Sequence, residues 1–332
     1  LINDELGNNS NDTLDLKTAS EELGESAAPF GMDELIGLSG AGTRPNFTTD
    51  LTAVNTGISG EGKVQTDWVV ALDPTGTQGG ESFALKRSTN SNMSSATTIS
   101  TNNDNSELET GLTAGVLYYF QATGTNDAGS TNSSIVSARA TKLPSITSFS
   151  VTTGTGGLGL IDINWSIDNG YPNSLTAFKV EQSLSSNMSN ATDATTTNDG
   201  SHQYNVSANA GATVYFRITA TNSVGTTVST IKSAVASSKP TINSFTGARS
   251  ETVAGRVDLN WSTTAGTAAT SAFSITRGTT LANAIGGTSV TTVNDGTQQV
   301  TGIGTGVSNF YYMTITNANG TYVSAAVVNT EA

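Results

Sequence analysis

The sequence predicts an all-β protein, in which three tandem β-sandwiches follow a mostly irregular N-terminal arm. Three observations lead to this prediction. A chain of 332 residues is long enough for two or three domains. The same landmark residues recur three times at a spacing of about 95 residues. Apolar and polar residues alternate with a period of two between clusters of Gly, Asn, Asp and Ser, which is typical of half-buried strands.

Four landmarks define the repeats, and they keep their order in every copy. A tryptophan closes an apolar-x-apolar-x pattern at Trp68, Trp165 and Trp261, with Thr66 as the one polar exception. A Phe-x-apolar pair follows at Phe83, Phe178 and Phe273. An Asn-Asp turn comes next, at 103–104, 198–199 and 294–295, and Asn-x-x-Gly closes the copy at 126–129, 222–225 and 317–320. Chance matches in a biased composition do not keep four landmarks in order, so we predict three tandem repeats.

Proline opens each copy, at Pro45, Pro144 and Pro240. Because proline fixes φ and cannot continue a hydrogen-bonded ladder, it suits a domain boundary. The predicted units are the arm at 1–44 and three sandwiches at 45–143, 144–239 and 240–332. The linkers at 141–143 and 237–239 are short, which predicts a semi-rigid rod on the order of 100 Å long.

The alternation also predicts which residues face each core. In the second copy, Val214, Phe216, Ile218 and Ala220 alternate with polar residues and Tyr215, so the first four are expected to face inward. About seven strands are expected in each copy. The predicted core aromatics are Trp68, Trp165, Trp261, Phe83, Phe178, Phe273, Phe120, Phe216 and Tyr311.

The second copy resembles a fibronectin type III domain. The resemblance lies in Trp165, in the segment 178–180, and in the segment 214–225, which reads Val-Tyr-Phe-Arg-Ile-Thr-Ala-Thr-Asn-Ser-Val-Gly. The tyrosine-corner position of that family falls on Tyr118 in the first copy, but on Val214 and Asn309 in the other two. The resemblance covers about 45–332 and implies an Ig-like sandwich fold, not an activity.

The arm differs from the repeats. It carries nine acidic residues and two basic residues, a net charge of −7. A capping box at 18–21 predicts a short helix, and 32–36 predicts another helical turn. The arm is either a disordered acidic tail or a docking segment that folds on a partner. Its apolar residues favour docking, because a purely solvated tail would carry fewer of them. They include Ile2, Leu6, Leu14, Leu16, Phe30, Met32, Leu35 and Ile36.

Three stretches of the arm, at 2–7, 14–16 and 31–37, resemble the leader of virion structural proteins of tailed phages, especially phages of marine cyanobacteria. The resemblance implies a virion component that is found in the extracellular particle. It also implies that residues 1–44 attach to other virion proteins.

Composition excludes several kinds of site. With no cysteine and one histidine, the chain has no disulfide scaffold, thiol nucleophile or zinc-thiolate site. The single His202 supports no Ser-His-Asp arrangement, so we expect no enzymatic activity, no cofactor and no metal site. The net charge of −13 argues against nucleic-acid binding. No run of 18 apolar residues occurs, so we expect no membrane insertion.

The leading hypothesis is a non-enzymatic phage virion structural protein, either a tail or neck fibre or a capsid decoration. Its outward Ig-like domains would adhere weakly to a host surface polysaccharide, and a symmetric particle would make it a homo-oligomer. Tyr119, Tyr215 and Tyr312 are candidates for stacking on sugars. The alternative is a bacterial cell-surface or secreted adhesin. An accessory part of a polysaccharide-degrading enzyme would require a catalytic domain as well.

Overall fold

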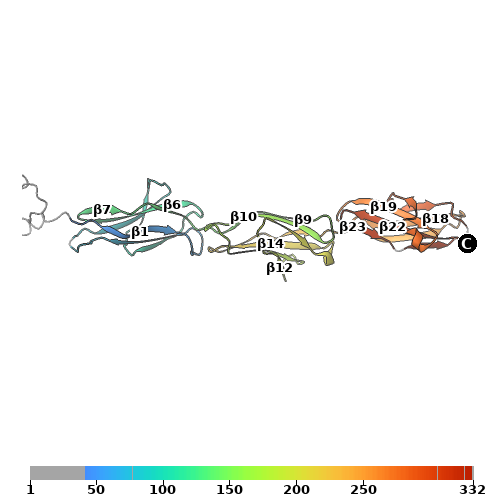
Figure 1. Ribbon diagram of the computed structural model, residues 1–332, viewed down its shortest axis with the longest axis horizontal. Coiled ribbons are helices and arrows are strands. Elements are labelled where there is room, and N and C mark those ends of the chain that lie inside the picture. Colours follow the sequence, from blue (N-terminus) through green and yellow to red (C-terminus); the bar gives the residue numbers. More distant parts are fainter. Residues whose placement is uncertain (1–41, 77, 305, 325, 331–332) are drawn as a thin grey trace, which may run out of the picture.

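A computed structural model describes residues 42–330, apart from 77, 305 and 325. In this part of the chain, strands form three sandwiches that lie end to end along one axis (Figure 1). The predicted all-β class with three sandwiches is confirmed. Residues 1–41 of the predicted arm, with both of its predicted helical turns, lie outside the described residues, whereas 42–44 are described and the Thr43 carbonyl bonds to the first sandwich.

The first sandwich has eight strands, all paired antiparallel. One sheet has the order β1-β2-β5, and the other has the order β4-β3-β6-β7, with β8 also on β6. The strands are β1 Asn46–Val54, β2 Val64–Ala71, β3 Ser82–Ser88, β4 Thr97–Ser100, β5 Ser106–Glu109, β6 Leu117–Asn126, β7 Gly129–Asn132 and β8 Val136–Arg139.

The second and third sandwiches repeat this order strand for strand. The second contains β9 Ser145–Thr153, β10 Leu160–Asp168, β11 Ala177–Ser183, β12 Thr192–Thr195, β13 Ser201–Asn205, β14 Thr213–Thr221, β15 Thr226–Val228 and β16 Lys232–Val235. The third contains β17 Thr241–Arg249, β18 Val257–Thr264, β19 Thr270–Gly278, β20 Thr288–Thr291, β21 Thr297–Val300, β22 Ser308–Asn317, β23 Gly320–Val323 and β24 Val327–Thr330. Two packed antiparallel sheets in this order form an Ig-like, fibronectin type III-like sandwich.

Eight strands occur where about seven were expected, because the last strand of each sandwich is broken in two. A serine stands at each break: Ser133, Ser229 and Ser324. Its backbone N–H donates to a carbonyl of the neighbouring long strand. The serine hydroxyl accepts the backbone N–H of the residue that carries this carbonyl, at 2.9, 2.8 and 2.9 Å in the three sandwiches. The serine side chain therefore replaces a missing backbone acceptor, and the sheet continues past the break.

Each sandwich has its own core, centred on a tryptophan that stacks on a phenylalanine. The ring centroids of the three pairs are 5.0, 5.4 and 5.5 Å apart. All nine core aromatics named from the sequence are buried, with Trp68 only 1% exposed. Val214, Phe216, Ile218 and Ala220 all face inward, as the alternation predicted.

Each tryptophan also has a polar partner. The indole nitrogens of Trp68, Trp165 and Trp261 donate to asparagine side chains at 3.0, 2.8 and 2.8 Å. The acceptors are Asn103, Asn198 and Asn294. These asparagines open the Asn-Asp turns of the sequence repeat, so the turn signal marks a residue that satisfies a buried donor.

The tyrosine corner occurs in the first sandwich, where the hydroxyl of Tyr118 accepts the backbone N–H of Thr113 at 3.1 Å. In the second sandwich the corresponding Val214 is fully buried and has no hydroxyl. In the third, the amide of Asn309 donates to the carbonyl of Val307 at 3.1 Å instead. The second and third sandwiches, which lack the corner tyrosine, therefore each have a different local structure at this position.

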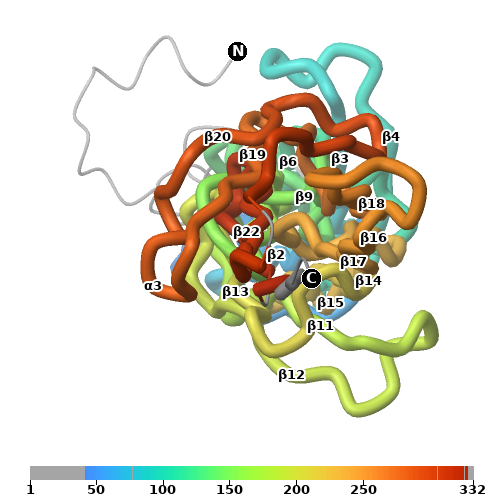
Figure 2. The backbone as a smooth tube through the Cα atoms, turned by 90° about the vertical axis from the view of Figure 1, so that its right-hand side faces the viewer, coloured from blue at the N-terminus to red at the C-terminus, as the bar shows by residue number. Residues whose placement is uncertain are grey.

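Successive sandwiches are turned about the long axis. Viewed along the axis, the corresponding strands β4 and β12 lie on different sides (Figure 2). The outer faces of the three sandwiches therefore point in different directions around the rod.

Candidate functional site

The most regular built feature of the molecule lies where the chain enters each sandwich. An asparagine at the end of the long strand donates its side-chain amide to the carbonyl of the entering segment. The bonds are Asn126 to Thr43 at 2.8 Å, Asn222 to Lys142 at 2.9 Å and Asn317 to Ser238 at 3.2 Å. We call this arrangement the asparagine clamp.

Each clamp holds a second carbonyl in a loop of its own sandwich. These acceptors are Leu72, Asn169 and Ala265, at 2.9, 3.0 and 2.8 Å. The clamp asparagines are 4%, 3% and 3% exposed, so an unpaired amide there would be costly. The clamp therefore ties the linker, the loop and the long strand together.

The Asn-x-x-Gly sequence explains the local geometry. The side-chain oxygen of Asn222 accepts the N–H of Val224 at 2.9 Å and of Gly225 at 3.2 Å, which forms the turn. Gly225 has φ of +157°, and a Cβ there would lie 2.8 Å from the side chain of Leu143. The fourth landmark thus marks the joint, a role that the sequence pattern alone did not reveal.

The outer faces of the sandwiches are rich in hydroxyl groups. Neighbouring strands carry hydroxyl pairs 2.8–2.9 Å apart at Thr125–Ser130, Thr221–Thr226 and Thr316–Thr321. The opposite sheets carry similar pairs at Ser148–Ser166 and Ser244–Ser262. Such faces offer many donors and acceptors.

The three tyrosines considered for sugar stacking are half-buried, not fully exposed. Tyr119 and Tyr215 occupy corresponding positions on β6 and β14, next to the buried Phe120 and Phe216. Tyr312 on β22 follows the buried Tyr311 instead. They lie in three different sandwiches, so the structure does not bring them together into one site.

A charged cluster lies on the outer face of the second sandwich. The carboxylate of Glu181 accepts from Arg217 Nε at 2.8 Å, Arg217 Nη2 at 3.2 Å and Lys179 Nζ at 2.8 Å. The Thr219 hydroxyl donates to it at 3.2 Å. The hydrogen bonds from Arg217, more than those from Lys179, lower the pKa of Glu181 to about 2. The carboxylate has four donors on it, so we assign it a structural role.

His202 lies on β13, and its ring centroid is 6.5 Å from that of Tyr204, in a tilted arrangement. In the described ranges, no three His, Asp or Glu side chains come close enough together to hold a metal ion. Two open hollows occur on the second sandwich, with volumes of about 430 and 480 Å³. Lys232 is the one ionised side chain that lines them.

The eight apolar arm residues named from the sequence all lie outside the described residues. Across the part that the structure describes, no helix is long and apolar enough to cross a membrane.

No protein-family model matches the chain, and no curated protein matches its sequence. Among solved structures, the chain is similar to the FN1–FN3 domains of chicken CNTN1, with a TM-score of 0.34 and 12% sequence identity. The match covers 85% of this chain and 99% of that chain. The fold assignment rests on the strand order within each sandwich, and this likeness carries nothing about activity or partners.

Proposed function

We propose that the protein is a non-enzymatic structural rod that holds three Ig-like sandwiches outward from a particle surface. One observation carries this proposal: in each of the three sandwiches, a buried asparagine clamps the entering chain. Each clamp fixes the end of a short linker to the sandwich that follows it, which favours an extended chain of sandwiches over loosely tethered domains. A spacer needs length and stiffness, and it needs no catalytic cleft.

The particle that we favour is the virion of a tailed phage, in which the protein is a fibre or a decoration. The support is the resemblance of the arm to virion leaders. In this proposal, residues 1–44 attach to other virion proteins, and the particle displays several copies. The apolar residues of the arm provide the contact area for attachment.

We further propose that the outward faces adhere weakly to a host surface polysaccharide. The hydroxyl pairs of the outer faces suit hydrogen bonding to neutral sugars, and the faces point in several directions around the rod (Figure 2). Single contacts of this kind are weak, so adhesion depends on many copies binding together. The alternative function is a bacterial surface or secreted adhesin that uses the same faces.

Light scattering of the full chain and of a fragment from residue 42 tests the attachment role of the arm. The fragment must keep Thr43, because its carbonyl occupies the first clamp. We expect the fragment to be monomeric and the full chain to assemble. If both are monomers, and the full chain binds purified virions no better than the fragment does, the attachment role is wrong.

Glycan binding by the same fragment, multimerised on a bead, tests the adhesion role separately. We expect retention of cells or of surface polysaccharide that the single fragment does not show. No retention at high copy number would contradict adhesion and leave the attachment role standing.

A further inference from the structure

The two joints of the rod are built differently, and the difference begins in the length of one loop. The loop between β1 and β2 has nine residues, 55–63. The corresponding loop of the second sandwich has six, 154–159, and that of the third has seven, 250–256. The longer loop lies at the end of the first sandwich that faces the second.

This loop makes direct contacts across the first joint. The backbone N–H of Gly60 donates to the carbonyl of Val224 in the second sandwich at 2.9 Å. The Glu61 carboxylate accepts the backbone N–H of Leu143 at 2.8 Å. The loop is itself held, because the Thr141 hydroxyl donates to the Gly60 carbonyl at 2.7 Å. First sandwich, linker and second sandwich are thus bonded to one another.

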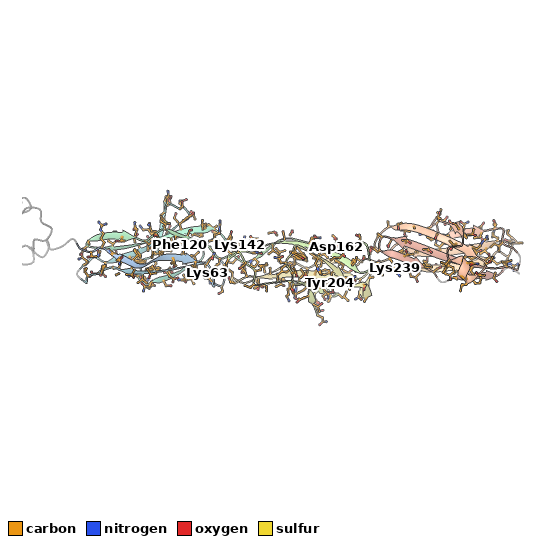
Figure 3. The ribbon with its side chains drawn as sticks, in the orientation of Figure 1. Lys63, Phe120, Lys142, Asp162, Tyr204 and Lys239 are labelled. Atoms are coloured by element: carbon orange, nitrogen blue, oxygen red, sulfur yellow. The ribbon has the colours of Figure 1, made fainter. Side chains whose placement is uncertain are left out.

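Side chains add to the first joint. Lys142 of the linker (Figure 3) pairs with Asp168 of the second sandwich, with 2.5 Å between Nζ and Oδ2. The backbones of Lys142 and Tyr171 exchange two hydrogen bonds of 2.9 Å. The guanidinium of Arg139, from the first sandwich, lies 5.2 Å from the ring centroid of Tyr171. Such a cation–π contact links the two sandwiches directly.

The second joint has no such direct links. Ser237 bonds back to the second sandwich, and Ser238 bonds forward to Asn317, Asn319 and Thr267 of the third. Lys239 of the linker is labelled in Figure 3. Its Nζ lies 5.4 Å from the ring centroid of Tyr322, also in the third sandwich. Among the described residues, no hydrogen bond or ion pair joins the second sandwich itself to the third. In this part of the chain, the second and third sandwiches are joined through the linker alone, and the bonding partner changes from the second to the third sandwich at the peptide bond between Ser237 and Ser238.

We propose that the rod has two parts: the first and second sandwiches form one rigid unit, and the third swings about a hinge at 237–238. Direct contacts restrain relative rotation at the first joint, whereas domains without such contacts move by default. The hinge lets the third sandwich orient itself against a surface while the other two keep it at a distance. This inference concerns the joints and does not rest on the proposed attachment or adhesion.

Spin-label distance measurements on the full chain test the hinge. The chain has no cysteine, so labels can be placed through introduced cysteines alone. Thr97, Thr192 and Thr288 are exposed first residues of the corresponding strands β4, β12 and β20. The pair T97C/T192C spans the first joint, and T192C/T288C spans the second. We expect the second distance distribution to be broader by about twofold or more. Equal widths, or a broader first distribution, would overturn the proposal.

Variants of the first joint test whether its contacts cause its rigidity. Asp168→Asn removes the ion pair with Lys142, and Glu61→Ala removes the acceptor for Leu143. Each is expected to broaden the first distribution toward the width of the second. The matched control is Asp162→Asn on the same strand β10, whose partner is Gln203, and it should change neither distribution. Unchanged widths in both joint variants would contradict the assigned contacts.

Discussion

At the residue scale, the tryptophans show how one side chain serves both packing and hydrogen bonding. The indole ring fills the core and stacks on a phenylalanine, while its nitrogen reaches an asparagine in a turn. A buried indole N–H without an acceptor is costly, so the turn asparagine has a role beyond turn formation.

Asn198→Ala tests this role in the second sandwich. The variant leaves the indole N–H of Trp165 without its acceptor, so we expect a loss of about 1–2 kcal/mol in the free energy of unfolding. Urea unfolding measures the loss, with Trp68 and Trp261 replaced by phenylalanine so that Trp165 alone reports. Replacing the exposed Asn173 by alanine is the control. A loss no larger than that of the control would show that the hydrogen bond does not stabilise the fold.

Glu181 predicts a pH dependence. Its pKa in the folded chain is about 2, below the ordinary 4.5, because Arg217 and Lys179 bond the ionised form. The ionised carboxylate therefore stabilises the second sandwich above pH 4.5, and this contribution is lost as the pH falls toward about 2. Allowing for the partial exposure of both cations, the contribution is about 1–3 kcal/mol.

The test compares wild type at position 181 with Glu181→Gln at about pH 6 and about pH 3, with Trp68 and Trp261 replaced by phenylalanine in both so that Trp165 alone reports. We expect the wild type to lose more stability between these pH values than the variant loses. Asp199→Asn, in an exposed turn, is the control. An equal loss in wild type and Glu181→Gln would mean that Glu181 does not cause the acid sensitivity.

At the element scale, the broken last strand shows how a sheet edge is completed without a continuous ladder. The backbone of the last strand moves away from the long strand at the serine, and the serine hydroxyl accepts the N–H of the long strand in place of a backbone carbonyl. The break also divides the last strand of each sandwich into pieces of at most four residues, which limits pairing of that edge with another chain.

Ser229→Ala tests the break. Without the hydroxyl, the N–H of Ile218 loses its acceptor, so we expect a loss of about 1–2 kcal/mol in stability. Hydrogen exchange of the Ile218 amide should be faster in the Ser229→Ala variant than in the wild type. Ser233→Ala, on the exposed face of β16, is the matched control. Unchanged exchange at Ile218 would contradict the role assigned to the hydroxyl.

Local patterns predicted the elements well, because alternation and turn residues act over a few positions. The inward set from Val214 to Ala220 and the tryptophan positions follow from that alternation. The polar partners could not be predicted in this way. Trp68 and its acceptor Asn103 are 35 residues apart in sequence, and Asn126 reaches back 83 residues to Thr43. Such pairs depend on how whole strands come together, so no local pattern specifies them.

The serine breaks were missed for a different reason. The chain contains serine throughout, and the recurrence of Ser133, Ser229 and Ser324 seven residues after each Asn-x-x-Gly asparagine was not among the four landmarks. The difference between the joints, by contrast, has a visible sequence cause, because the segment 55–63 is longer than its counterparts.

At the scale of the whole molecule, each asparagine clamp fixes the entering chain to the sandwich that follows, which favours an extended rod. Asn222→Ala frees the carbonyls of Lys142 and Asn169 and opens the turn before Gly225. We expect a loss of about 1–3 kcal/mol in the stability of the second sandwich, because a buried hydrogen-bonding group loses several partners. We also expect a broader label distance across the first joint. A clamp variant with unchanged distance and stability would contradict this role.

Small-angle X-ray scattering of residues 42–332 tests the central claim, that the three sandwiches form an extended rod, most directly. We expect an elongated particle with the cross-section of one sandwich and a maximum dimension on the order of 100 Å. Bending at the second joint shortens this dimension only moderately. A compact particle, with the sandwiches packed side by side, would contradict the account.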